Sequence, residues 1–167
     1  MHSTRAFFPR IGGLVLAALL PLCAQRAAAD DSILTLKYGD HSLKLTAAEL
    51  AAIPHVEFAA TNGHTKETHH YGGVPVRVLL TRLEVPSDEK LRGKEMQLTV
   101  IVRAADGYGV AFAITQFDER FTDRTVYLVD SVDRHPLDAK WGPLALIVPG
   151  DKVPGRWARM VTAIEVK

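Results

Sequence analysis

Short apolar segments separated by turn residues are the feature that most restricts how this chain can fold. Two pairs of such segments are residues 33–36 with 41–45, and residues 97–103 with 110–114. The turns between them, Tyr38-Gly39-Asp40 and Ala105-Asp106-Gly107-Tyr108, both place glycine beside aspartate. Glycine and aspartate tolerate the left-handed backbone that tight hairpins require. The pattern therefore predicts two antiparallel hairpins.

Helical signals are few and short. Thr46 and Glu49 form a capping box that predicts a helix through Ile53, ended by Pro54. A second helix is predicted to begin at Pro75, with an apolar face at Val76, Leu79, Leu80 and Leu83. Residues 69–74 are expected to lead into this helix. Further strands are expected at residues 56–60, 125–129, 144–148 and 160–166. No strand–helix–strand alternation repeats, so the predicted class is β-rich α+β with short helices.

The first 29 residues have the pattern of a cleavable signal peptide. Arg5 and Arg10 precede an apolar stretch, residues 11–24, that is short for a membrane span. Ala27-Ala28-Ala29 then supplies small residues for cleavage before Asp30. The prediction is a single domain, residues 30–167, exported to the periplasm without direct membrane anchoring. The alternative is a lipoprotein anchored through Cys23, which the bulky Leu22 disfavours.

Charge and cysteine content exclude several classes of protein. Residues 1–29 carry three of the 20 Lys+Arg residues and none of the 19 acidic residues, which leaves a net charge of −2 for residues 30–167. With no basic stripe, this balance does not indicate nucleic-acid binding. Cys23 is the single cysteine and lies in the predicted signal peptide. The mature chain should therefore fold without disulfides.

Four sequence blocks, in order, resemble the sulfite-oxidase-type molybdopterin-binding domain. They are Tyr71–Leu80, Ala104–Tyr108, Tyr127–Leu137 and a C-terminal block made of Gly142–Asp151, Arg156–Val161 and Ile164–Val166. The resemblance implies that family's fold, in which mixed sheets carry short helices and a cysteine thiolate binds the molybdenum. Residues 58–62 occupy the matching strand and contain no thiol. A molybdenum centre would lack its protein bond there.

The resemblance extends to a small group of periplasmic bacterial proteins with the same scaffold and no cysteine. Some of that group bind reduced pterins and report to an inner-membrane enzyme that makes or degrades cyclic di-GMP. The missing Arg-Arg pair also points away from the twin-arginine export that preloaded molybdenum proteins use. The expected function is pterin binding without catalysis, metal or molybdopterin, with the periplasmic domain of a signalling enzyme as partner. The alternative is a molybdopterin-dependent oxidoreductase, or an accessory subunit, with an atypical metal ligand.

The loop from Pro149 to Arg159 is the predicted ligand site. Its two glycines and two prolines favour close approach of backbone to a ligand. Arg156 and Trp157 could stack on a flat heterocycle, and Asp151 could bind its amidine-like edge. The resemblance assigns cofactor contact to Arg159. The alternative is that Trp157 packs on the core and the arginines are solvated.

The loop between Thr61 and Tyr71 is the predicted opposite wall. It and its flanks contribute Asn62, His69 and Tyr71, with Tyr108 as a further core or wall residue. The histidines here match no zinc spacing, so a solvated cluster is the favoured interpretation. Asp106 is interpreted as a turn residue rather than a ligand contact. No arrangement typical of a catalytic triad or paired carboxylates is found.

Overall fold

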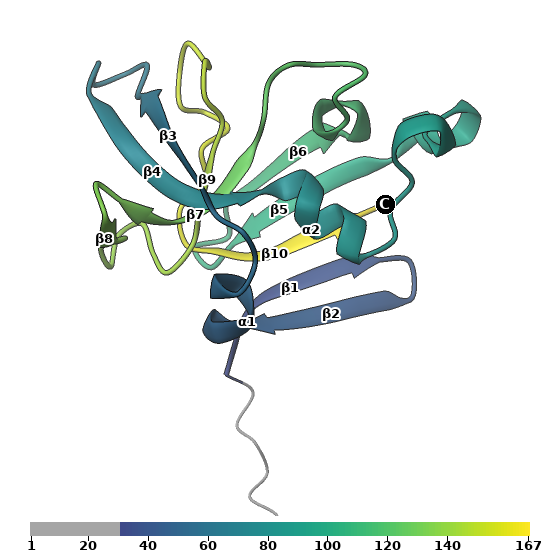
Figure 1. Cartoon of the computed structure of the whole chain (residues 1–167), viewed down its shortest axis with the longest axis horizontal. Helices are drawn as coiled ribbons and strands as arrows, with labels where there is room; N and C mark the ends of the chain where they lie inside the picture. Colours follow the sequence, from purple (N-terminus) through teal and green to yellow (C-terminus); the bar gives the residue numbers. More distant parts are fainter. Residues whose placement is uncertain (1–30) are drawn as a thin grey trace, which may run out of the picture.

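A computed structural model describes residues 31–167 as two sheets with short helices (Figure 1). The first sheet has the strand order β2-β1-β10-β5-β6. The second has the order β3-β4-β7-β8, with β9 also paired to β7. The strands are β1 (Ser32–Tyr38), β2 (His41–Thr46), β3 (Val56–Thr61), β4 (Thr68–Pro75), β5 (Thr99–Ala104), β6 (Gly109–Ala113), β7 (Tyr127–Val132), β8 (His135–Pro136), β9 (Ala145–Ile147) and β10 (Val161–Val166). The predicted signal peptide lies outside the described residues.

Both predicted hairpins are confirmed in the first sheet. β1 pairs antiparallel with β2 up to Tyr38 opposite His41, and β5 pairs with β6 up to Arg103 opposite Gly109. β10 lies between these hairpins, parallel to β1 and antiparallel to β5. The first and last described strands are therefore neighbours, which makes the sheet mixed.

The second sheet contains a strand that the sequence analysis missed. Residues 69–74 belong to β4, which lies between β3 and β7. Gly72 and Gly73 hide the strand signal because glycine has no side chain to pack. A Cβ on Gly73 would lie 2.3 Å from the carbonyl oxygen of Leu128. Glycine is therefore required here, because β7 lies too close to β4 for any side chain.

Both predicted α-helices form, although α1 ends at Ala51 instead of Ile53 and α2 begins at Val76 instead of Pro75. α1 (Ala47–Ala51) has the expected capping box: Thr46 N donates to Glu49 Oε2 at 2.8 Å, and Glu49 N donates to Thr46 Oγ1 at 3.2 Å. α2 (Val76–Arg82) follows Pro75 and buries the predicted apolar face. Short 3₁₀ turns are found at Asp88–Lys90, Gly93–Gln97 and Ile114–Phe117. No helix among residues 31–167 is long and apolar enough to cross a membrane.

One hydrophobic core joins the two sheets and both α-helices. It includes Leu36 of β1, Phe112 of β6, Leu79 of α2 and Ile147 of β9, each at most 2 % exposed. β9 carries three consecutive buried residues, as expected for a strand covered on both faces. The chain leaves this strand directly into the loop at 149–159, so the core fixes one end of the predicted site.

Candidate functional site

Two segments distant in the sequence approach each other closely at the predicted site. They are the turn at 61–68, between β3 and β4, and the loop at 149–159, between β9 and β10. A Cβ on Gly63 would lie 2.1 Å from the carbonyl oxygen of Lys152. Only glycine therefore fits at this contact. The expected pairing of these two loops as opposite walls agrees with this geometry.

A hollow of about 540 Å³ lies between the two walls. Its lining residues are Ala59, Ala60, Thr61, Gly63, Lys66, Pro149, Gly150, Asp151 and Lys152. Most of these side chains are small, so the walls can lie close to a thin ligand. The rim, by contrast, carries charge from two lysines and one aspartate.

The charge of Asp151 is satisfied within its own loop. Arg156 Nε donates to Asp151 Oδ2 at 2.9 Å, and Arg156 Nη2 donates to Asp151 Oδ1 at 2.5 Å. The hydrogen bond to Asp151 raises the pKa of Arg156. The guanidinium carbon lies 5.3 Å from the centre of the Phe112 ring. This ion pair holds the loop in shape. A ligand could bind the charge of Asp151 or Arg156 only by replacing the other member of the pair.

The lysines at the rim differ in availability. Lys66 Nζ donates to the carbonyl oxygen of Gly63 at 2.6 Å. Lys152 is exposed and makes no ion pair or side-chain hydrogen bond with any residue that the structure describes. Lys152 therefore provides the most accessible positive charge at the hollow.

The far end of the loop is fastened to the turn between β5 and β6. Tyr108 Oη donates to the carbonyl oxygen of Gly155 at 2.5 Å, and Arg159 Nε donates to Asp106 Oδ2 at 3.2 Å. Asp106 also accepts from Tyr108 N at 3.0 Å, as expected for a turn residue. This backbone hydrogen bond is the main cause of the lowered pKa of Asp106. Tyr108 and Arg159 thus hold the end of the loop in place through these hydrogen bonds.

The stacking prediction for Trp157 is wrong in this structure. Trp157 is 6 % exposed, and its Nε1 donates to the carbonyl oxygen of Val148 at 2.9 Å. Its ring meets Tyr71 edge-on, with centroids 6.1 Å apart. The alternative, in which Trp157 packs on the core, is correct. Sequence alone does not distinguish the two because an aromatic residue in a loop suits either role.

Tyr71 belongs to the same buried aromatic group. It is 8 % exposed and stacks on Phe58 with ring centroids 5.9 Å apart. Burial raises the pKa of its phenol. Tyr71 therefore packs in the core and does not line this hollow.

Asn62 and His69 hydrogen-bond within two different turns. Asn62 Oδ1 accepts from the backbone N–H groups of His64 and Thr65, at 2.9 and 3.3 Å, and so closes the turn. His69 Nδ1 lies 2.7 Å from Asp133 Oδ2, on the turn after β7. Neither side chain lines the hollow. The hollow is also lined by residues that sequence reasoning did not select, because small residues and lysines give no distinctive signal: Ala59, Ala60, Gly63, Lys66 and Lys152.

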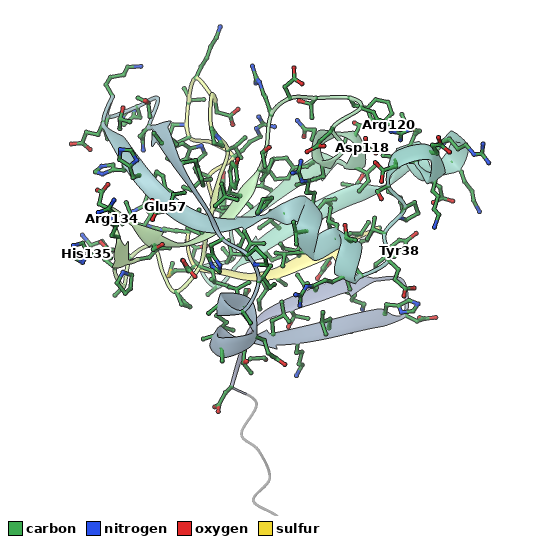
Figure 2. The ribbon with its side chains drawn as sticks, in the orientation of Figure 1. Tyr38, Glu57, Asp118, Arg120, Arg134 and His135 are labelled. Atoms are coloured by element: carbon green, nitrogen blue, oxygen red, sulfur yellow. The ribbon has the colours of Figure 1, made fainter. Side chains whose placement is uncertain are left out.

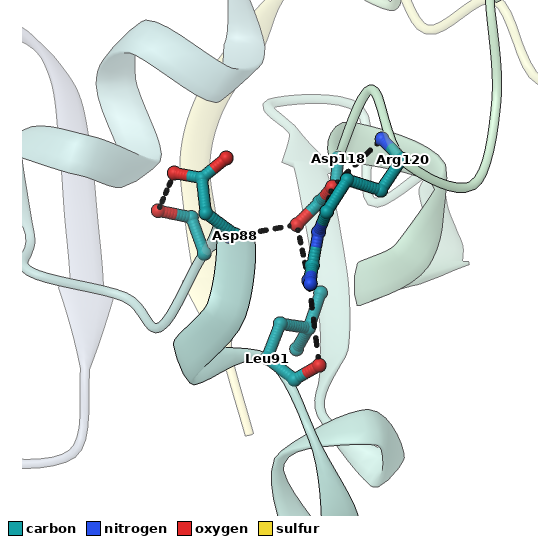
Figure 3. A network of polar contacts seen from close by, with 5 residues as sticks. Asp88, Leu91, Asp118 and Arg120 are labelled. Atoms are coloured by element: carbon teal, nitrogen blue, oxygen red, sulfur yellow. Dashed lines mark hydrogen bonds and ion pairs between the residues drawn. The ribbon is translucent and has the colours of Figure 1, made fainter.

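A buried carboxylate outside this site was also missed. Asp118 is 6 % exposed and accepts from Arg120 Nε and Nη2 at 3.1 Å each, and from Asp88 N at 2.8 Å (Figure 3). The hydrogen bonds from Arg120 are the main cause of the lowered pKa of Asp118. Arg120 Nη2 also donates to the carbonyl oxygen of Leu91 at 3.4 Å. Figure 2 shows Asp118 and Arg120 on the side of the molecule away from Glu57 and Arg134. The network fastens two loops together, which is a structural role.

The described residues do not offer a metal-ligand set. No group of three His, Cys, Asp or Glu side chains in residues 31–167 is arranged to hold a metal ion. The same residues contain no thiol, since the single cysteine is Cys23. The chemistry of the donors in the described chain therefore does not fit a molybdenum centre.

Comparison with known proteins adds evidence on the fold. No family model and no curated protein matches the chain. The crystal structure of the sulfane dehydrogenase SoxCD from Paracoccus pantotrophus matches with a TM-score of 0.62 at 18 % sequence identity. The match covers 83 % of this chain and 39 % of that chain, so this chain spans about two fifths of the solved structure. The fold is therefore β-rich and sulfite-oxidase-like, with mixed sheets and short helices.

Proposed function

We propose that this chain is a periplasmic pterin-binding protein without metal chemistry of its own. In this proposal it relays ligand occupancy to an inner-membrane enzyme that makes or degrades cyclic di-GMP. The ligand is a reduced pterin, and export proceeds through the signal peptide at residues 1–29. The molybdopterin-related fold supports a pterin ligand, and the donor set of residues 31–167 argues against bound molybdenum.

The observation that carries this proposal is the shape of the hollow. Ala59 and Ala60 of β3 and Pro149 and Gly150 of the loop at 149–159 all line the hollow, and each has a small side chain or none. A flat bicyclic ring can lie between such walls and contact both. The buried Trp157 takes no part in the contact in this conformation.

Polar groups at the rim would fix the orientation of the ring. A pterin has one edge of N–H donors and one edge with a carbonyl acceptor. The ammonium groups of Lys152 and Lys66 are suited to the acceptor edge. Backbone carbonyl oxygens of residues 149–152 are the expected partners of the donor edge. Asp151 keeps the loop in shape through Arg156.

The position of the hollow suggests how occupancy is relayed. A ligand held between the two walls ties the turn at 61–68 to the loop at 149–159. Val153, at the tip of that loop, is 66 % exposed and is a suitable apolar contact for a partner. Ligand binding would then fix the conformation of a surface that the signalling enzyme reads.

Thermal melting of the purified protein with and without tetrahydropterin, under anaerobic conditions, tests the binding step. A bound ligand raises the melting temperature by mass action. Lys152→Ala should weaken binding about tenfold, since the ligand loses a charge-assisted hydrogen bond. Lys94→Ala is the matched control because that lysine is 90 % exposed and lies outside the lining residues.

Other results would change the proposal in defined ways. The absence of any shift with reduced pterins would favour an accessory subunit that makes protein contacts alone. Stoichiometric molybdenum in protein purified from a periplasm would favour the oxidoreductase alternative. The relay requires a separate test, in which the periplasmic domain of a cyclic di-GMP enzyme binds this chain more tightly with tetrahydropterin present. Intact mass of the exported protein checks cleavage before Asp30.

A further inference from the structure

A second hollow lies on the outer face of the β3–β4–β7 sheet, away from the proposed pterin site. Its volume is about 200 Å³, and its lining includes Glu57, His70, Gly72, Ser131, Asp133 and Arg134. It exists because Gly72 has no side chain. Glu57 and Ser131 are the neighbours of Gly72 on the two flanking strands. A Cβ on Gly72 would lie 2.4 Å from Ser131 Oγ and would cover the floor.

Two opposite charges line this hollow without neutralising each other. Glu57 and Arg134 are exposed, and neither makes an ion pair or side-chain hydrogen bond with any residue among 31–167. Figure 2 shows Glu57, on β3, and Arg134, at the β7–β8 turn, on the same side of the molecule. A free carboxylate and a free guanidinium at one small hollow complement a ligand that carries both charges.

The backbone at Arg134 has a conformation that its residue type does not favour. The two-residue turn between β7 and β8 places Asp133 at φ 49° and Arg134 at φ 65°. Such turns favour glycine at the second position, because a side chain there is sterically disfavoured. The turn itself therefore does not explain the arginine. Unfavourable backbone conformations of this kind gather at binding sites.

The turn is also held firmly against β4. Asp133 N donates to the carbonyl oxygen of His70 at 2.6 Å, and Asp133 Oδ1 accepts from His70 N at 3.0 Å. Asp133 Oδ2 pairs with His69 Nδ1 at 2.7 Å. The carboxylate of Asp133 thus fixes the β7–β8 turn against β4. This turn places Arg134 in the lining of the hollow.

We propose that this hollow binds a small zwitterion of amino-acid size, with its ammonium group at Glu57 and its carboxylate at Arg134. The floor at Gly72 lets the ligand reach the sheet, and the hydroxyl of Ser131 and the ring of His70 offer further hydrogen bonds. The volume limits the ligand to a molecule of few heavy atoms. The proposal does not depend on the pterin site, because the two hollows share no lining residue.

Isothermal titration of the full chain with glycine, β-alanine and γ-aminobutyrate tests the proposal. At least one of these zwitterions should bind saturably at millimolar concentrations. N-acetylglycine, which lacks the ammonium, and glycinamide, which lacks the carboxylate, should each bind at least tenfold more weakly. Binding of N-acetylglycine as tightly as the zwitterions would overturn the proposal in favour of a simple anion site. No saturable binding of any of the three zwitterions would also overturn it.

Variants separate binding from folding. Glu57→Gln and Arg134→Gln should each weaken zwitterion binding at least tenfold, whereas the remote Asp40→Asn and Arg92→Gln should not change it. Arg134→Gly is the decisive variant, because it relieves the unfavourable backbone conformation. It should abolish binding without lowering the melting temperature. A lower melting temperature for Arg134→Gly would show that the arginine has a structural role and would overturn the proposal.

Discussion

Replacing Trp157 should damage the fold far more than it damages ligand binding. Trp157 is 6 % exposed and donates its Nε1–H to Val148. Truncation of a buried tryptophan to alanine costs about 3–5 kcal/mol, from lost transfer energy and the cavity left behind. Trp157→Phe keeps most of the apolar volume but loses the hydrogen bond, worth about 1 kcal/mol, and leaves a small void worth about as much again. We therefore expect about 4 kcal/mol for the first variant and about 2 kcal/mol for the second.

Urea unfolding followed by circular dichroism measures both values. Domains of this size have a stability of about 5–15 kcal/mol, so Trp157→Phe should remain folded and should bind tetrahydropterin with unchanged affinity. Trp141→Phe is the matched control: Trp141 is only partly buried, and no hydrogen bond joins its Nε1 to the described residues. An unchanged urea midpoint for Trp157→Ala, together with a tenfold loss of tetrahydropterin affinity, would show that Trp157 serves the ligand and not the core.

Three further changes test other parts of the structure. Asp118→Ala should lower the free energy of unfolding in urea by about 2–3 kcal/mol, since two backbone N–H groups lose their acceptor. The guanidinium of Arg120 also loses its carboxylate partner, and hydrogen bonds to water replace that partner only in part. Because the pKa of Asp118 is lowered in the folded protein, its carboxylate stabilises the fold fully above its ordinary pKa of about 4. This stabilisation is lost as the pH falls through the lowered pKa. The melting temperature of Asp118→Ala should therefore fall less steeply in acid than that of the parent. Gly63→Ala should force the two walls apart at Lys152. Titration calorimetry should then show weaker tetrahydropterin binding, with only a small drop in melting temperature. Thr46→Ala removes the capping box of α1 and should cost about 1 kcal/mol in urea unfolding.

Local signals in the sequence determined most of the secondary structure of this protein. Turn residues placed both hairpins, and the pair Thr46 and Glu49 placed the start of α1. These signals succeed because the residues involved interact with near neighbours along the chain. The strand β4 was missed because its glycines are explained only by the approach of β7, a contact between residues far apart in sequence.

The sequence alone also indicated the fold and the two loops that form the candidate site. Only the tertiary structure decided what each side chain in those loops does. It buried Trp157, paired Asp151 with Arg156, and brought Gly63 against Lys152. It also left Glu57 and Arg134 at a second hollow without an ion pair to any residue among 31–167. The physical reason is that burial and ion pairing depend on which distant segments meet, and composition and spacing within one segment do not specify that.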